Sequence, residues 1–376
     1  MPMKNFLIKL SLFAAPVLFF FLPPAFLLKI SGENFTGISH FITQNPKYLI
    51  GYAYNDNAKY LKYQTLASKN KYEVLALGSS RILQMRAEMF RGSFYNCGYT
   101  VSGILDFMPF LHKIPKEKYP KLLVISLDQF MFNAHWDELD TNKNANIEKI
   151  FSLTQTPSVH TIYKVWTDIF NKKYDYKRLI NSDALPKIGL GAKINNAGFR
   201  ADGSRAYGND VAKLIGKDST AYDFNFSGTL LRVAQGNQRF EYGSEVNPKA
   251  VEELEKVLLF CKKNGVAVVA FLPPFADKVL KKMKQSGNYA YLDGIYPQIK
   301  PIFTKYGFEL WDFTNPNTAL VADDEFLDGF HGGELCYLKM LQHMAQNQSV
   351  VAQYTDANKL KLDIKNTPNN YVVYAD

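Results

Sequence analysis

Short apolar segments that alternate with helical ones most constrain the fold of this 376-residue chain. The apolar segments lie at residues 73–77 (EVLAL), 93–96, 122–127 (LLVISL), 266–272 (VAVVAFL) and 308–313. Segments of helical character lie at residues 81–90, 104–112, 248–263 and 333–347. A short strand with a continuous apolar run has apolar side chains on both of its faces. Such strands, alternating with helices, are typical of a parallel sheet covered on both faces. We therefore predict an α/β fold with three layers, α/β/α, around a central parallel sheet.

A second constraint is the apolar stretch near the amino terminus. Residues 10–28 form 19 positions without a charge, and Ser11 is the only polar side chain among them. As a helix this stretch is about 28 Å long, close to the roughly 30 Å thickness of a bilayer core. Lys4 and Lys9 precede it, so the positive-inside rule places the amino terminus in the cytoplasm and the rest of the chain outside it. We predict a single-pass membrane anchor at residues 1–31, with a cleaved signal peptide as the alternative.

The remaining chain divides by composition into a connector, one domain and a tail. A polar connector covers residues 32–70, an α/β domain covers 71–350, and a tail covers 351–376. The domain has a large insertion at about 133–246, where substrate choice can reside. The insertion contains an amphipathic helix whose apolar side chains are Val159, Ile162, Trp166, Ile169 and Phe170. This stripe is more typical of core packing than of a ligand site.

Composition excludes several classes of protein. With 47% apolar and 21% charged residues, the chain is neither disordered nor collagen-like nor a coiled coil. Its three cysteines form no metal-ligand spacing, and we predict no metal and no cofactor. The net charge of +9 fits anionic lipid headgroups, an anionic envelope polymer or a solvated surface without a partner. A location outside the cytoplasm argues against nucleic acid.

Two short motifs carry the chemistry. The first, Gly78-Ser79-Ser80-Arg81, directly follows the first apolar segment. A serine at the start of a helix lies near backbone N–H groups that can stabilise an oxyanion, although a simple helix cap has the same pattern. The second motif, Asp328-Gly329-Phe330-His331, precedes the last helix. Its spacing lets the carboxylate orient the imidazole toward a serine.

The two motifs, in this order on an α/β pattern, resemble the SGNH (GDSL-like) hydrolase superfamily. Its first block is a Gly-x-Ser nucleophile after the first strand, and its last block is Asp-x-x-His near the carboxyl end. The resemblance implies a flavodoxin-like sheet, Ser80 as nucleophile, His331 as general base and Asp328 as the orienting carboxylate. It covers roughly residues 70–132 and 248–350.

The middle blocks of the family match less closely. The oxyanion glycine of the second block corresponds to Gly103, with Gly98 as the alternative. In the third block the usual asparagine is absent, and the sequence reads Ser126-Leu127-Asp128-Gln129-Phe130. An ionised Asp128 cannot donate a hydrogen bond, whereas Gln129 can. The predicted oxyanion hole therefore combines Ser80, Gly103 and Gln129.

Within the superfamily, the chain is similar to D-alanyl transfer proteins of teichoic acid modification and to SGNH-like partners of membrane-bound O-acyltransferases. This implies an acyl-Ser80 intermediate and O-acylation, by acetyl or D-alanyl, of an anionic or neutral cell-surface glycopolymer. A membrane-bound O-acyltransferase would be the partner. Arg81, Asp128 and Arg200 are candidate substrate contacts, with a surface salt bridge as the alternative for Arg200. Rival hypotheses are a carbohydrate O-acetylesterase with the same triad and a non-catalytic polysaccharide-binding scaffold.

Overall fold

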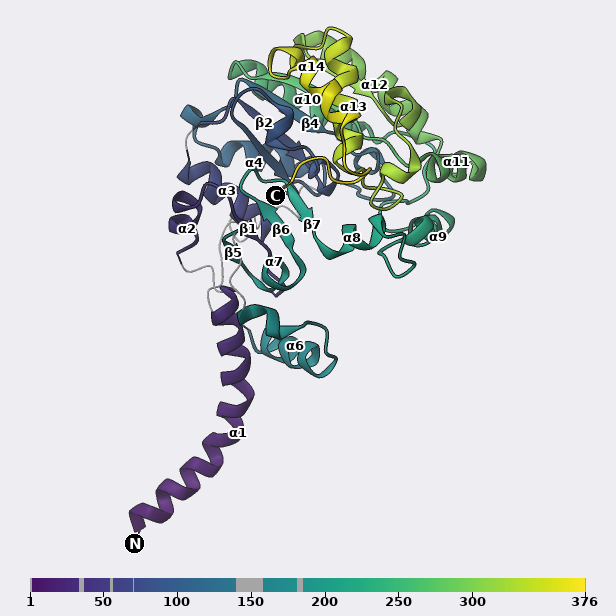
Figure 1. Cartoon of the computed structure of the whole chain (residues 1–376). Helices are drawn as coiled ribbons and strands as arrows, with labels where there is room; N and C mark the ends of the chain where they lie inside the picture. Colours follow the sequence, from purple (N-terminus) through teal and green to yellow (C-terminus); the bar gives the residue numbers. More distant parts are fainter. Residues whose placement is uncertain are drawn as a thin grey trace. The chain divides into compact units, whose positions relative to one another are not determined.

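The chain forms two compact units in the computed structural model (Figure 1). The model describes residues 2–33, 37–54, 57–69, 71–139, 158–180 and 185–375, so two parts of the predicted insertion, residues 140–157 and 181–184, lie outside the described residues. The first unit comprises Met1–Asn57, Lys149–Ala201 and Ala206–Gly208. The second comprises Ala58–Glu148, Asp202–Arg205 and Asn209–Asp376. The predicted insertion is thus divided between the units, and the predicted tail belongs to the second.

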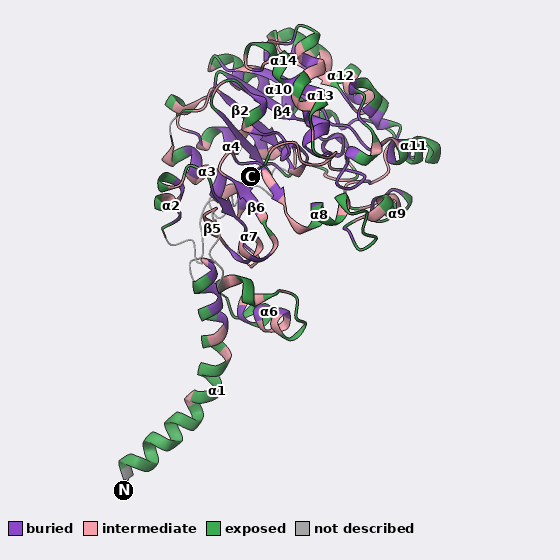
Figure 2. Cartoon of the chain, viewed as in Figure 1, coloured by how far each residue is buried: buried purple, intermediate pink, exposed green. Residues whose placement is uncertain are grey.

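A five-stranded parallel sheet is the centre of the second unit. Its strands are β2 (Val74–Gly78), β3 (Phe94–Gly98), β4 (Leu122–Ser126), β8 (Ala267–Leu272) and β9 (Glu309–Asp312). They lie in the order β3-β2-β4-β8-β9, and all neighbouring pairs are parallel. Every residue of β2, β3 and β4 is buried, as Figure 2 shows for the sheet. The five predicted strands and the parallel sheet are confirmed, because continuous apolar runs can be buried on both faces.

Helices connect and follow these strands. Among the described residues, the α-helices of the second unit are α3 (Ala58–Ser68), α4 (Phe107–Lys113), α8 (Asn209–Ile215), α9 (Ser227–Gln235), α10 (Pro248–Lys263), α11 (Asp277–Ser286), α12 (Tyr291–Tyr306), α13 (Glu334–Gln346) and α14 (Ala357–Lys365). Helix α10 covers the predicted residues because local signals determine both of its ends. The side chain of Asn247 accepts from Lys249 N, Pro248 occupies the first turn, and Gly265 has φ 67° after the last turn.

The segment after β2 differs from the prediction. In place of a helix over residues 81–90, two short 3₁₀ turns form at Ser80–Ile82 and Ala87–Met89. The Asn96 side chain explains the difference, because its Nδ2 donates to the carbonyls of Ile82 at 2.8 Å and Met85 at 2.9 Å. A tertiary hydrogen-bond donor therefore takes the carbonyl groups that a longer helix would use.

The first unit contains the long amino-terminal helix and a small sheet. Its α-helices are α1 (Pro2–Ser31), α2 (Ile38–Gln44), α6 (Val159–Phe170) and α7 (Leu190–Asn195). The small sheet has the order β5-β1-β6-β7, with strands β5 (Lys187–Ile188), β1 (Leu49–Ile50), β6 (Ala197–Arg200) and β7 (Arg205–Tyr207). Among the described residues, α1 is the one helix long and apolar enough to cross a membrane. Figure 2 shows it exposed along most of its length and buried near its carboxyl end.

Candidate functional site

Ser80, His331 and Asp328 form a chain of hydrogen bonds in the second unit. Ser80 begins the turn directly after β2, and its Oγ lies 2.9 Å from Nε2 of His331. The Nδ1 atom of His331 lies 2.9 Å from Oδ2 of Asp328 and 3.0 Å from its Oδ1. Ser80 and His331 are partly exposed, whereas Asp328 is buried. This is the geometry of a nucleophile, a general base and an orienting carboxylate.

The local backbone keeps Asp328 ionised. Its Oδ1 accepts hydrogen bonds from the backbone N–H of Phe330 at 2.8 Å and of His331 at 2.6 Å. Burial by itself would raise the pKa of Asp328, but the His331 ring and these two N–H groups lower the pKa below its ordinary value. An ionised Asp328 holds the proton on Nδ1 of His331. The Nε2 atom is then free to accept the proton of Ser80.

Two backbone N–H groups remain available for an oxyanion. Among the described residues, the N–H groups of Ser80 and Gly103 have no hydrogen-bond acceptor. Gly98, the alternative to Gly103, donates its N–H to Asn96 Oδ1 at 2.7 Å. The ring of Trp136 lies against Gly103, where an added Cβ would come within 3.2 Å of it. The contacts therefore favour Gly103 over Gly98, and they leave little space at Gly103 for a side chain.

The Gln129 side chain is not free to join the oxyanion hole. It is buried, and its amide nitrogen donates to Pro273 O at 2.7 Å and to Thr314 Oγ1 at 3.0 Å. Both amide hydrogens are therefore used, contrary to the expectation from the sequence. The amide oxygen accepts from Arg81 Nη1 at 2.8 Å, so Gln129 holds neighbouring loops together.

Arg81 and Asp128 are buried, and neither side chain has a surface that a bound molecule could reach in this structure. Their side chains are both 0% exposed, with Arg81 Nη1 3.7 Å from Asp128 Oδ1. Arg81 Nη2 also donates to Pro274 O at 2.5 Å, and its guanidinium stacks on the rings of Phe275 and Phe330, 4.7 and 4.2 Å from their centroids. Arg81 thus links the loops after β2, β4 and β8 to the turn that carries His331. The prediction of substrate contacts failed here because sequence adjacency to Ser80 does not reveal burial.

Burial has opposite effects on the two partners of this ion pair. It raises the pKa of the Asp128 carboxyl, an effect that the Arg81 charge opposes. It lowers the pKa of the Arg81 guanidinium, which Asp128 counteracts. Burial therefore favours the neutral form of each group, and the charge of its partner opposes that shift.

Arg200 belongs to the first unit of the chain. It is buried at the end of β6 in the first unit, where it pairs in register with Leu49 of β1. Ser80 belongs to the second unit. The hydrogen bonds and ion pairs of the Ser80 site described above do not include Arg200.

The sequence did not predict several residues that support the Ser80 site. Asn96 is fully buried, and its three side-chain hydrogen bonds link the end of β3 to the turns that follow β2. An aromatic series continues from Trp136 to Phe130 (4.6 Å between centroids), to Phe330 (6.1 Å) and to the His331 ring (5.1 Å). An asparagine inside an apolar strand, and a phenylalanine inside the Asp-x-x-His motif, were the available signals.

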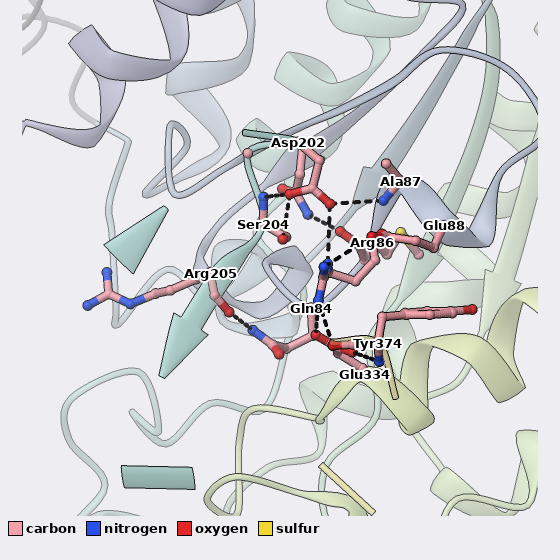
Figure 3. Close-up of polar contacts among 12 residues, drawn as sticks. Gln84, Arg86, Ala87, Glu88, Asp202, Ser204, Arg205, Glu334 and Tyr374 are labelled. Atoms are coloured by element: carbon pink, nitrogen blue, oxygen red, sulfur yellow. Dashed lines mark hydrogen bonds and ion pairs between the residues drawn. The ribbon is translucent and has the colours of Figure 1, made fainter. Parts of the chain in front are cut away.

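A buried ion-pair network holds the helix that follows His331 (Figure 3). Arg86 lies 2.7 Å from Glu334, the first residue of α13, and 3.3 Å from Asp202. Burial disfavours the charged form of Arg86, but Glu334, Asp202 and Glu88 raise its pKa above the ordinary value. Glu334 Oε2 also accepts from the backbone N–H groups of Val373 and Tyr374, at 2.9 and 3.0 Å. The carboxyl-terminal residues are thus hydrogen-bonded to the element that positions His331.

A cavity of about 340 Å³ adjoins the residues that precede Asp328. Its lining comprises Leu214, Lys217, Asp223, Phe224, Asn225, Phe226, Lys278, Asp323, Asp324, Phe326, Leu327 and Tyr371. Asp223, Asn225 and Phe226 have φ values of 53°, 56° and 63°, which non-glycine residues rarely adopt. The Gly329 N–H also donates to Asp223 Oδ2 at 3.4 Å. The cavity wall and the turn that contains Asp328 and His331 therefore share contacts.

The cysteines and acidic residues present no further reactive centre in the described part of the chain. Cys97, Cys261 and Cys336 are unpaired and buried, and burial raises the pKa of Cys97 to about 12. Such a thiol is protonated at neutral pH and is a poor nucleophile. Among the described residues, no group of three or more His, Cys, Asp or Glu side chains is arranged to hold a metal ion.

In comparisons with known proteins, no family model matches this sequence and no curated protein is detectably similar to it. Inference about function therefore depends on the residues and their geometry.

Proposed function

We propose that this protein is a membrane-anchored serine acyltransferase or esterase of SGNH type that works outside the cytoplasm. The observation that carries the proposal is the hydrogen-bonded series from Ser80 through His331 to Asp328. The strand order β3-β2-β4-β8-β9, numbered from the first strand of the unit, is 2-1-3-4-5, the flavodoxin-like order. Ligands in such three-layer α/β/α folds bind beyond the carboxyl ends of the strands, where the order reverses. Ser80 follows β2 at this reversal.

The chemistry consists of two half-reactions at Ser80. His331 Nε2 takes the hydroxyl proton as Ser80 Oγ attacks the acyl carbonyl, and the backbone N–H groups of Ser80 and Gly103 stabilise the oxyanion. Collapse of the tetrahedral intermediate expels the leaving group, which receives the proton from His331. In the second half-reaction, His331 Nε2 takes the proton of an acceptor hydroxyl as that oxygen attacks the acyl carbonyl. Ser80 Oγ then leaves and receives this proton from His331. A sugar hydroxyl as acceptor completes a transfer, and water completes a hydrolysis.

The acceptor that we propose is a hydroxyl of a cell-surface glycopolymer, and the acyl donor comes from a membrane-bound O-acyltransferase. Helix α1 would hold the site beside the membrane, where such a donor emerges. The 340 Å³ cavity is a candidate acceptor subsite, since it combines aromatic faces of Phe224, Phe226 and Tyr371 with polar groups. These features suit a sugar ring, which needs an apolar face and hydrogen-bonding edges.

An active-serine phosphonate tests the nucleophile. Intact-mass analysis should show one adduct on the full chain and none on Ser80→Ala. Ser79→Ala is the matched control, because Ser79 is buried beside Ser80 and its Oγ accepts a hydrogen bond from Arg81 N. Equal labelling of the Ser80→Ala protein would refute the assignment, and a wild-type chain that is never labelled would favour the scaffold hypothesis.

The identity of the acyl acceptor, a sugar hydroxyl or water, distinguishes transfer from hydrolysis. The chain is co-expressed with a membrane-bound O-acyltransferase, and intact mass is measured for wild type and Ser80→Ala. A Ser80-dependent adduct of acetyl or D-alanyl mass supports transfer. Rapid release of acetate from an acetylated oligosaccharide by the purified chain alone identifies an esterase.

A further inference from the structure

Helix α6 presents an apolar face to the surroundings of the first unit. Ser158 caps its start by accepting from Thr161 N at 3.1 Å. The side chains of Val159, Tyr163 and Phe170 are 64%, 63% and 76% exposed. They share one face with Trp166, because residues 159, 163, 166 and 170 recur at helical spacing. Ordinary soluble surfaces rarely gather four large apolar side chains on one helix face.

The neighbouring face of α6 is packed within the first unit. Ile162 and Val165 are buried, and Val165 belongs to a cluster with Leu27 and Leu28 of α1 and with Leu190. Helix α6 therefore has two apolar faces: one is packed within the first unit, and the other is exposed. A helix that needed only to pack on α1 would have polar residues at these exposed positions.

Trp166 joins α6 to α1 at a defect in the α1 hydrogen bonding. Pro24 lies four residues after Phe20 and has no N–H, so the carbonyl of Phe20 lacks its helical donor. Trp166 Nε1 donates to this carbonyl at 2.8 Å, and its ring stacks on Phe19 with centroids 5.5 Å apart. An unsatisfied carbonyl is especially costly in hydrocarbon, where water cannot replace the donor.

The contact lies near the end of the exposed apolar part of α1. Leu27 and Leu28 are packed in the core of the first unit, so the part of α1 that can face lipid ends at about Phe26, which is 65% exposed. Phe20 precedes Phe26 by six residues, about 9 Å of helix rise. Exposed lysines lie on and just after α6, at Lys164, Lys172 and Lys177. Tryptophan and tyrosine with neighbouring lysines are typical of the interface between acyl chains and headgroups.

We propose that α6 is an interfacial helix whose face of Val159, Tyr163, Trp166 and Phe170 inserts into the leaflet next to the first unit. The exposed lysines then contact anionic headgroups. Helix α6 would thus restrain the orientation of the first unit on the membrane, since a single spanning helix leaves rotation free. The inference depends on the anchoring role proposed for α1 and is independent of the chemistry at Ser80.

Fluorescence of Trp166 in vesicles tests the proposal. The chain contains three tryptophans, so Trp136→Phe and Trp311→Phe leave Trp166 as the single reporter. The full chain is reconstituted in vesicles of phosphatidylcholine and phosphatidylglycerol, with or without bromine on the acyl chains. We expect bromine near the carboxyl end of the acyl chains to quench Trp166 at least twofold and acrylamide to quench it little.

Charge substitutions on the exposed face provide a second measurement. Val159→Glu with Phe170→Glu should reduce quenching by brominated lipid, because both side chains point away from the packed core. Leu362→Glu, at a position 57% exposed in α14, is the matched control and should leave the quenching unchanged.

The remaining outcomes overturn the proposal in distinguishable ways. If the chain floats with the vesicles but Trp166 is quenched by acrylamide and not by bromine, α6 faces water or a protein partner and the proposal is wrong. If the chain does not float, the anchoring role of α1 and the proposal fail together. Phosphonate labelling of Ser80 in the chain that keeps all three tryptophans, reconstituted in the same vesicles, reports separately on the proposed chemistry.

Discussion

Individual buried charges determine how the Ser80 site is held. Arg81 and Asp128 are both fully buried, and Arg81 also contacts Gln129 and Pro274. The Arg81 guanidinium makes directional contacts in place of apolar ones. It therefore defines the relative positions of the loops that follow β2, β4 and β8. Arg81, the residue next to Ser80, therefore holds these loops in position, and its side chain has no exposed surface.

Removing one partner of this pair should be costly. Arg81→Met leaves the Asp128 carboxylate buried without its counter-charge, and we expect a loss of about 3–5 kcal/mol in the free energy of unfolding. Denaturant unfolding followed by circular dichroism measures it. Arg91→Met is the control, because Arg91 pairs with Asp356 at the surface with 60% and 39% exposure, and its loss should not be detectable. A change of equal size in both variants would contradict the structural role of Arg81.

The Asp328 carboxylate should affect both rate and acid stability. Asp328→Asn removes the charge that holds the His331 tautomer, so phosphonate labelling of Ser80 should slow by about 10⁴-fold. The pKa of Asp328 is lowered in the folded chain from an ordinary 3.8, so its stabilisation is complete above that value. This stabilisation is lost as pH falls through the lowered folded-state pKa.

The free energy of unfolding of wild type and of Asp328→Asn, measured as a function of pH, tests whether Asp328 stabilises the fold in its ionised form. The difference in unfolding free energy between the two should be constant at neutral pH and should shrink as the pH falls below 3.8. A difference that grows on acidification would contradict an ionised Asp328.

At the scale of elements, short loops and turns carry the site while strands and helices hold it. The sheet places Ser80 after β2 and Asp128 after β4, and the turn before α13 supplies His331. The sequence predicted the strands because their apolar runs are local signals. It did not predict the 3₁₀ turns after β2, because these depend on Asn96, a residue of another strand.

The carboxyl-terminal residues should matter for reactivity although they are far from Ser80 in sequence. Removing residues 369–376 deletes the Tyr371 carbonyl that accepts from Glu334 N at 2.9 Å and the two N–H groups that donate to its carboxylate. The start of α13 would loosen, and the labelling rate of Ser80 should fall by up to about 100-fold.

Removal of residues 375–376 alone is the control for this truncation, because it leaves these hydrogen bonds in place. Its labelling rate should match that of the full chain. Thermal unfolding of both truncations separates loss of fold from loss of positioning. An unchanged rate after the longer truncation would show that the tail does not position His331.

At the scale of the whole molecule, the chain passes repeatedly between two compact units. The predicted insertion contributes residues 149–201 to the first unit and residues from 209 onward to the second. Helix α1 is part of the first unit at its carboxyl end, where Leu27 and Leu28 are 9% and 5% exposed. The candidate anchor helix is therefore also part of a folded core.

Two amino-terminal truncations should separate these roles. A chain that begins at residue 22 keeps Leu27, Leu28 and Glu33, whose carboxylate accepts from Ala53 N and Leu190 N. A chain that begins at residue 34 loses all three. Burial of each leucine contributes about 2–5 kcal/mol, so the second truncation should unfold its first unit more readily.

Hydrogen exchange of residues 185–200 measures this effect. Protection should persist in the chain that begins at residue 22 and should fall in the chain that begins at residue 34. Equal protection in both would show that the end of α1 is dispensable for the first unit.

The sequence by itself determined the parallel sheet, the candidate anchor helix and the pairing of a serine after the first strand with a late Asp-x-x-His. These are local signals, because apolar runs and turn residues act on their own neighbourhood. The tertiary structure decided which side chains near Ser80 are buried. It showed Arg81, Asp128 and Gln129 engaged within the protein, and it revealed Asn96 and Glu334 as supports of the site. Burial and long-range hydrogen bonds depend on segments far apart in the sequence, such as Ser80 and His331, which are 251 residues apart, and only the folded chain brings such segments together.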